Sequence, residues 1–245
     1  MLPCDGGVES RLLPAAIPAC PPSEGPFRGT LQIRPDANGD GQADNAYCTA
    51  GFNAKRTISG SSQWLVTTAG HCSAGFNVNW KHSTGQDLLI GPDKGSQSWH
   101  TVDGAIIQIN DPGGYWKPQN TIWRPSNNNY PITRKISTPG SSLWGNWICH
   151  AGSNLGGYEA CGTLLTHNAG FLNNVGMGAV QAPACPGDSG GPWFNGSTNR
   201  AYGLHKGSTN ASVCPGPSNE TSYLTWVSNF EAAFGGGILT APVGW

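Results

Sequence analysis

Charged residues are scarce in this chain, and their scarcity removes several classes of function. Lys and Arg number 13 and Asp and Glu number 14 among 245 residues, so the formal net charge is -1 at pH 7. With no basic patch and no acidic tail, nothing indicates a nucleic-acid partner or a strongly charged protein partner. We therefore search for partners through a site on the chain, and we expect a monomer.

Long hydrophobic runs are also missing. No stretch approaches the roughly 18 apolar residues that a membrane-spanning helix needs, so we predict no membrane insertion. The first twenty residues, MLPCDGGVESRLLPAAIPAC, hold no uninterrupted apolar segment of the kind found in a signal peptide. We interpret the chain as a mature form from which a leader has been removed.

Glycine, proline and cysteine are abundant by contrast. The 36 Gly and 19 Pro indicate frequent turns. The cysteines lack the short C-x-x-C repeats of zinc sites, so four disulfides and a secreted, extracellular protein are predicted. In the Pro-rich extension, residues 1–26, we expect one pair, Cys4 and Cys20, to close a local loop. The other six cysteines are Cys48, Cys72, Cys149, Cys161, Cys185 and Cys214.

Short β-like runs recur between turn signals, as in QWLVTTAG, DGAIIQI and RAYGL. Helical spacing is clear only in residues 220–234, where apolar residues fall three and four apart at Leu224, Val227, Phe230, Ala233 and Phe234. The pattern predicts an all-β barrel or pair of barrels with one C-terminal helix.

The segment CPGDSGGPWF carries the strongest chemical signal. Its glycines let the backbone turn sharply around Ser189, so that the N–H groups of Gly187 and Ser189 point at one spot. Paired donors of this kind form an oxyanion hole, worth about 3 kcal/mol per donor in acyl transfer. This pattern predicts a nucleophilic serine.

A serine hydroxyl needs a base, and the chain offers one with an orienting acid. His71 lies in VTTAGHC, and Asp103 begins the apolar run DGAIIQI, where a carboxylate would be partly buried. Such a carboxylate orients the imidazole and stabilises its charged form. Asp87, Asp93 and Asp111 compete for this role but lie in turn-like contexts.

TAGHC, DGAII and GDSGGP, in this order, resemble the motifs of chymotrypsin-like serine endopeptidases. The resemblance covers about residues 45–240 and is nearest to the bacterial branch of streptogrisins and alpha-lytic endopeptidase, whose closed loop is similar to CHAGSNLGGYEACGTLLTHN. It implies two six-stranded antiparallel β-barrels and a C-terminal helix. His71 and Asp103 would come from residues 27–120 and Ser189 from residues 121–245. It also implies protein or peptide substrates and no catalytic cofactor.

The resemblance further implies the disulfides Cys48–Cys72, Cys149–Cys161 and Cys185–Cys214. In the bacterial branch, an arginine after the first cysteine of the loop pairs with the aspartate before the nucleophile. Here that residue is His150, so we predict that its imidazolium pairs with Asp188.

The segment GLHKGS would form one wall of the specificity pocket. Glutamyl endopeptidases of this fold carry a histidine at the place of His205, where it can bind a substrate carboxylate by a charge-assisted hydrogen bond. We therefore predict cleavage after Glu, with cleavage after medium or aromatic apolar residues as the alternative. No acid is expected at the pocket base, and Lys206 would point toward Asp103 or into solvent. The predicted substrate-binding residues are Ala184, His205, Lys206, Gly207 and Ser208.

A second candidate site lies in PDANGDGQADN. Its oxygen-bearing side chains have the spacing of a calcium loop, at Asp36, Asn38, Asp40, Gln42 and Asp44. Tyr47 at the twelfth position excludes a full EF-hand, which leaves a shortened structural calcium loop or a tight acidic hairpin. Glycosylation sequons start at Asn195, Asn210 and Asn219.

The leading hypothesis is a secreted serine endopeptidase that acts through an acyl-enzyme. Two alternatives remain open: an esterase-like hydrolase with the same triad, and a non-catalytic binding module stabilised by calcium.

Overall fold

The computed structural model describes residues 26–82, 87–124, 127–154, 159–210, 214 and 216–244. The predicted loop between Cys4 and Cys20 lies outside these residues. Within them, no helix is long and apolar enough to cross a bilayer.

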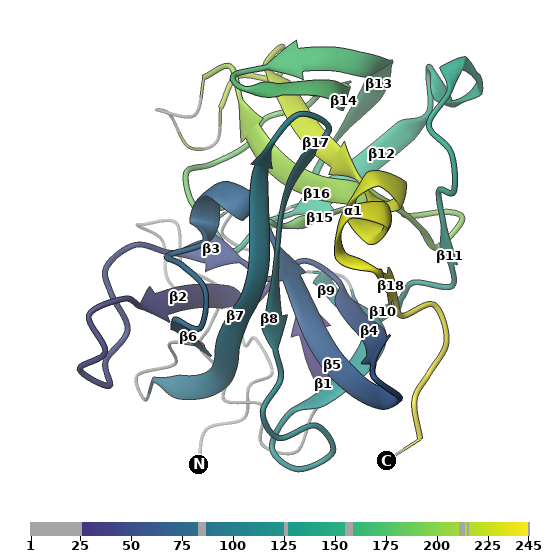
Figure 1. Ribbon diagram of the computed structural model, residues 1–245. Helices are drawn as coiled ribbons and strands as arrows, with labels where there is room; N and C mark the ends of the chain where they lie inside the picture. The colour runs from purple at the N-terminus through teal and green to yellow at the C-terminus, as the bar shows by residue number, and fades with distance from the viewer. Residues whose placement is uncertain are drawn as a thin grey trace, which may run out of the picture.

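The C-terminal half forms a closed barrel of six antiparallel strands, the green and yellow body of Figure 1. The strands follow the order β16-β15-β12-β13-β14-β17, and β17 pairs back onto β16. A two-residue strand, β11, adds to β16 in parallel. The bounds are β11 Arg134–Lys135, β12 Trp147–Ala151, β13 Glu159–Phe171, β14 Asn174–Gln181, β15 Pro192–Asn195, β16 Arg200–Ser208 and β17 Thr221–Trp226.

The N-terminal half forms an antiparallel sheet of eight strands in the order β18-β4-β5-β8-β7-β6-β2-β3. A smaller sheet of β1, β9 and β10 lies beside it, and β9 spans the predicted boundary at residue 120. The bounds are β1 Pro26–Gly29, β2 Gln32–Asp36, β3 Cys48–Thr49, β4 Asn53–Ile58, β5 Ser61–Thr68, β6 Asn79–His82, β7 Leu88–Trp99, β8 Val102–Gln108, β9 Lys117–Arg124, β10 Asn127–Pro131 and β18 Gly236–Ile238.

The predicted all-β, chymotrypsin-like fold with a C-terminal helix is confirmed. The first sheet has eight strands where six were expected, because the two-residue β3 and the C-terminal β18 extend it. Two single-turn 3-10 helices, η1 Gly70–Cys72 and η2 Ser141–Leu143, join strands.

The helix begins later than its sequence pattern predicted. Residues 221–226 form β17, which pairs with β14 and β16 and so closes the barrel. Only Val227–Phe234 are helical, as α1, and Gly235 ends the helix in the left-handed region at φ +64°. The helical spacing of Leu224 was therefore a coincidence, overridden by strand pairing.

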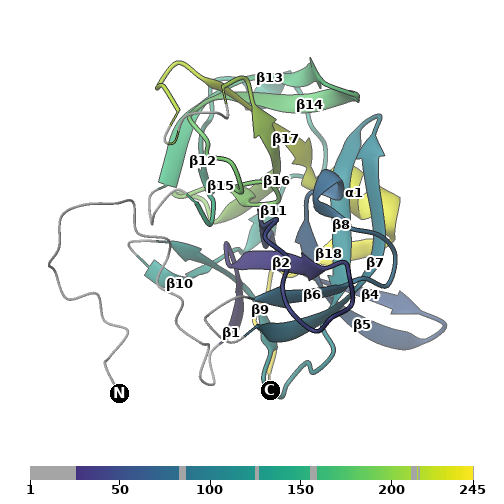
Figure 2. The same cartoon turned by 90° about the vertical axis from the view of Figure 1, so that its left-hand side faces the viewer.

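Helix α1 links the two sheets at the strand that carries Asp103. The ring of Phe230 packs on Gly104 of β8 so closely that an added Cβ there would lie 2.6 Å from it. Figure 2 shows α1 beside β7 and β8. Phe230 and Val227 share one buried core cluster with Ile106 of the first sheet and Leu204 of the second. The C-terminal segment therefore holds the two halves together beside the candidate site.

Candidate active site

His71 lies in η1, directly after β5. The chain passes so close to β7 here that a Cβ on Gly70 would lie 2.0 Å from the carbonyl oxygen of Gln97, so only glycine fits. The disulfide Cys48–Cys72 fixes the next residue to β3. His71 therefore lies between two fixed residues, Gly70 and Cys72, and its side chain stays 37 % exposed.

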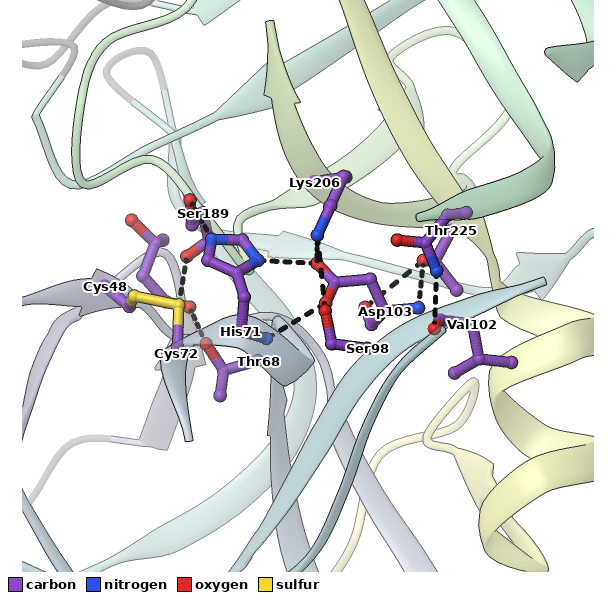
Figure 3. A network of polar contacts seen from close by, with 12 residues as sticks. Cys48, Thr68, His71, Cys72, Ser98, Val102, Asp103, Ser189, Lys206 and Thr225 are labelled. Atoms are coloured by element: carbon purple, nitrogen blue, oxygen red, sulfur yellow. Dashed lines mark hydrogen bonds and ion pairs between the residues drawn. A yellow bond between two sulfur atoms is a disulfide. The ribbon is translucent and has the colours of Figure 1, made fainter. Parts of the chain in front are cut away.

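Asp103 lies on β8 and is fully buried. Its carboxylate accepts the backbone N–H of His71 at 2.9 Å and the Nδ1–H of His71 at 2.7 Å. Its backbone N–H donates to Oγ1 of Thr225 on β17 at 2.9 Å. Both sheets therefore hold this residue (Figure 3).

Ser189 completes the cluster from the loop between β14 and β15. Its Oγ lies 2.9 Å from Nε2 of His71, on the opposite side of the ring from Asp103. The carbonyl of Ser189 accepts the N–H of Thr49, so β3 of the first sheet anchors the loop. The structure thus brings together the three residues predicted as a triad, from three separate segments.

The predicted oxyanion donors lie beside Ser189. Gly187 has φ +91°, and a Cβ there would lie 2.1 Å from the ring of Tyr47. In the described part of the chain, the N–H groups of Gly187 and Ser189 donate to no protein acceptor. These two amides, on either side of Asp188, are therefore available to a ligand oxygen.

Lys206 points toward Asp103, one of the two orientations left open by the sequence. Its Nζ lies 3.3 Å from Oδ2 of Asp103 and 3.3 Å from Oγ of Ser98. Burial alone raises the pKa of Asp103, but the hydrogen bond and charge of His71 and the charge of Lys206 outweigh it and lower that pKa. Asp103 is therefore a carboxylate at neutral pH.

The predicted pairing of His150 with Asp188 is wrong. Nε2 of His150 donates to the carbonyl of Pro183 at 3.0 Å, while the Asp188 carboxylate accepts the N–H groups of Cys185 and Asn154. Burial lowers the pKa of His150 to about 4, with the Pro183 hydrogen bond opposing it. His150 is thus neutral at pH 7, and backbone amides stabilise Asp188.

His205 is buried on β16, and its backbone is bonded to the loop of Ser189. Its N–H donates to Gly191 and its carbonyl accepts from Gly190, both at 2.8 Å. The ring stacks on His150 with centroids 4.7 Å apart and planes 5° apart. Burial, followed by the charges of His150 and His71, lowers the pKa of His205 well below its usual value.

Nδ1 of His205 accepts a long hydrogen bond of 3.4 Å from Nε1 of Trp193. A neutral imidazole that accepts at Nδ1 carries its proton on Nε2. No described residue bonds to that Nε2–H. His205 therefore presents one free donor.

Of the other predicted pocket residues, Gly207 and Ser208 follow His205 on β16, and Ala184 and Ser208 are buried. The sequence analysis missed one acid. The buried carboxylate of Glu220 accepts the N–H of Ala184 at 3.3 Å and that of Asn210 at 3.0 Å. No motif around Glu220 signalled this carboxylate.

Three side chains of the predicted calcium loop bond within it, and Oδ1 of Asp36 is buried without a hydrogen-bond partner among the described residues. Asp44 accepts the N–H of Ala37, Asp40 accepts that of Gln42, and Asn38 bonds to Asp40. Oδ2 of Asp36 lies 3.2 Å from the ammonium of Lys81.

Among the described residues, the one cluster of His, Cys, Asp and Glu side chains with metal-like spacing is Cys149, Glu159 and Cys161, and its two cysteines form a disulfide. The hydrogen bonds within residues 37–44 are those of a tight hairpin, and calcium binding stays a prediction. The pairs Cys48–Cys72, Cys149–Cys161 and Cys185–Cys214 are those implied by the resemblance.

Comparison with known proteins places this fold and site in a family. The profile of the Trypsin family matches residues 37–230, and the chain belongs to this family of serine proteases.

Two relatives come from Streptomyces griseus. Glutamyl endopeptidase 2 is 31 % identical over 173 residues, which cover 69 % of this chain and 82 % of the relative. Streptogrisin-C is 29 % identical over 207 residues, which cover 76 % of this chain and 42 % of the relative.

A solved structure with a TM-score of 0.67 and 25 % identity covers 86 % of this chain and 100 % of its own. That protein is a glutamic acid specific serine protease described as using a histidine triad in substrate binding.

The low pKa of His150 predicts acid-sensitive stability. The unfolded chain takes up a proton near pH 6.5 and the folded chain only near pH 4, so stability falls as pH drops between these values. The full loss from this group is about 3 kcal/mol. We expect His150→Phe, which keeps a ring in the stack, to flatten the dependence of unfolding free energy on pH in urea titrations. His167→Phe serves as the control and should keep the wild-type slope. A slope in His150→Phe as steep as that of the wild type would contradict the low pKa of His150.

The hydrogen bonds within residues 37–44 suit a hairpin that needs no ion, so we expect that calcium does not stabilise the fold. We expect the same melting temperature in millimolar calcium and in chelator, because binding to the native state alone would raise it by mass action. A calcium-dependent rise that disappears in Asp40→Asn would instead support the shortened calcium loop.

Proposed function

We propose that this protein is a secreted serine endopeptidase that hydrolyses peptide bonds through an acyl-enzyme. The observation that carries the proposal is the continuous chain from Asp103 to His71 at 2.7 Å and from His71 to Ser189 at 2.9 Å. These are hydrogen-bond distances at which a proton passes between nucleophile and base.

In the proposed reaction, Nε2 of His71 takes the proton of Ser189 as its Oγ attacks the substrate carbonyl carbon. Asp103 holds Nδ1–H of His71 and stabilises the imidazolium that forms. The imidazolium then gives the proton to the leaving amine, and an acyl-serine remains. A water molecule, deprotonated by His71, releases the acid product and restores Ser189.

The free N–H groups of Gly187 and Ser189 support the same mechanism. An oxyanion that forms at the attacked carbonyl needs donors that are already in place. Gly187 is held at its positive φ, and its carbonyl accepts the hydroxyl of Thr49 at 2.8 Å. The donors are therefore fixed before substrate binds.

Three disulfides support an extracellular location, because such bonds persist in oxidising compartments. Proteins and peptides are the substrates of this protease family, and a monomer is sufficient because all the proposed catalytic groups come from one chain.

We propose Glu as the preferred residue before the scissile bond. The support is the free Nε2–H of the buried, neutral His205, next to the loop that holds Ser189. A carboxylate that accepts this hydrogen bond draws a proton onto the ring and forms a charge-assisted pair. Glutamyl endopeptidase 2, a relative, carries this preference in its name.

Glu220 is the specific reason to test the opposite preference. Its carboxylate lies against Ala184 and would repel an acidic substrate or attract a basic one. Two backbone N–H groups already bind this carboxylate, whereas the Nε2–H of His205 has no bonding partner among the described residues. We therefore assign the recognition of substrate to His205.

The triad is tested by Ser189→Ala. We expect peptide hydrolysis to fall by a factor on the order of 10⁴ or more with the fold retained, because the nucleophile acts as one unit with its base. A fluorophosphonate should label the wild type and not this variant, while the exposed Ser61→Ala behaves as wild type. Undiminished hydrolysis by Ser189→Ala would exclude the mechanism, and cleavage of small esters without peptides would favour an esterase.

Specificity is tested with peptides that differ only in Glu, Gln, Leu, Phe or Arg before the scissile bond. We expect kcat/KM for Glu to exceed that for Gln by about 10-fold or more, because a hydrogen bond to a charged group contributes about 1.5–3 kcal/mol. His205→Ala should remove this difference, and His167→Ala, on the outer part of β13, should keep it. Equal rates for Glu and Gln, or a preference for Arg, would reject the role of His205.

A further inference from the structure

Lys206 is a buried cation in contact with the proposed catalytic acid. Its side chain is only 6 % exposed, and it extends from β16 of the second sheet toward β7 and β8 of the first. Nζ donates to Oγ of Ser98 at 3.3 Å and lies 3.3 Å from Oδ2 of Asp103 (Figure 3). That same Oδ2 accepts Nδ1–H of His71 at 2.7 Å.

The shared oxygen gives Lys206 an effect on His71 that acts through Asp103. The negative charge of Asp103 favours protonation of the imidazole, and the nearby ammonium cancels part of that attraction. Because both charged groups are buried, salt screens the effect far less than it screens a surface ion pair. The imidazole therefore faces a smaller net negative field than a triad without this lysine would give.

Few other charges act at this place. Around Asp103, β7 contributes the neutral Ser98, β17 contributes the neutral Thr225, and the charges that act on Asp103 are those of His71 and Lys206. His205, the neighbour of Lys206 on β16, is a buried histidine whose pKa lies well below its usual value. Among the described residues in contact with His71 or Asp103, Lys206 is the one basic residue besides His71 itself.

We propose that Lys206 is a positioning residue that fixes the Asp103 carboxylate and keeps His71 unprotonated, and so keeps the enzyme active, in more acidic solution. The inference rests on the proposed function, because it assigns the base role to His71. A preference for Glu is compatible with activity in more acidic solution, because the carboxylate of a Glu substrate stays ionised down to about pH 4.

A purely structural role for Lys206 makes a different prediction. The lysine bridges the two sheets, so its loss lowers stability in either case. Only the electrostatic role moves the pH at which activity falls. The test therefore compares pH profiles, which are normalised to the optimum of each variant.

The experiment measures kcat/KM from pH 4 to pH 9 for the whole protein and its Lys206→Met, Lys206→Ser and Lys206→Arg variants. The peptide is uncharged around the scissile bond, so that it does not titrate. The acid limb of a profile is the low-pH side on which kcat/KM falls. We expect this limb to move up by about 1 pH unit in Lys206→Met and Lys206→Ser, which is the size expected for the loss of one partly screened charge a few ångströms from the carboxylate. Lys206→Arg, which keeps the charge, should retain the wild-type limb.

Lys81→Met is the matched control. Lys81 is also 6 % exposed and lies 3.2 Å from a buried aspartate, Asp36, but the pair is in β6 and β2, away from His71. We expect this variant to melt at a lower temperature with an unmoved acid limb. An acid limb that coincides with wild type in Lys206→Met and Lys206→Ser would overturn the inference.

Rates of labelling at Ser189 by an uncharged fluorophosphonate give a second pH profile that needs no peptide cleavage. A wild type that labels at Ser189 but cleaves no peptide would reject the proposed function, while the labelling profiles would still decide the role of Lys206. If Lys206→Met does not fold, Lys206→Ser and Lys206→Arg decide it by the same measure.

Discussion

The buried carboxylate of Asp103 is the interaction on which the rest of the site depends. An ionised carboxylate without partners in a protein interior costs several kcal/mol, so the fold must supply donors to it. It does so from both halves: η1 gives two donors from His71, and β16 gives the ammonium of Lys206. The two sheets are therefore joined at a charge as well as at an apolar core.

The C-terminal segment maintains this junction. β17 places Thr225 against the backbone N–H of Asp103, and α1, which follows directly, packs Phe230 on Gly104. β18 then pairs with β4 of the first sheet. Because one continuous segment contacts both sheets around β8, the position of Asp103 depends on residues more than 120 positions away in sequence.

Local chemistry was predictable from the sequence, and long-range contacts were not. TAGHC and GDSGGP located His71 and Ser189 because sharp turns and free amides need glycine within a few residues. The strand at residues 221–226 was missed because pairing with β14 and β16 overrode a helical spacing of apolar residues. His150 was assigned by analogy to an arginine, but its partner is decided by the carbonyl of Pro183, 33 positions away.

The neutral stack of His150 and His205 gives a physical reason for histidine, rather than a permanent cation, at this place. A fixed cation, buried with no anion present, would destabilise the free enzyme. A neutral imidazole avoids that cost and becomes charged only when a substrate carboxylate arrives, because the pair then shares the incoming proton. If Glu is recognised as proposed, its binding takes up a proton and would be strengthened in acid, where an ordinary base would lose activity. In the role proposed for it, the ammonium of Lys206 beside Asp103 opposes that loss, so His205 and Lys206 would act in the same direction.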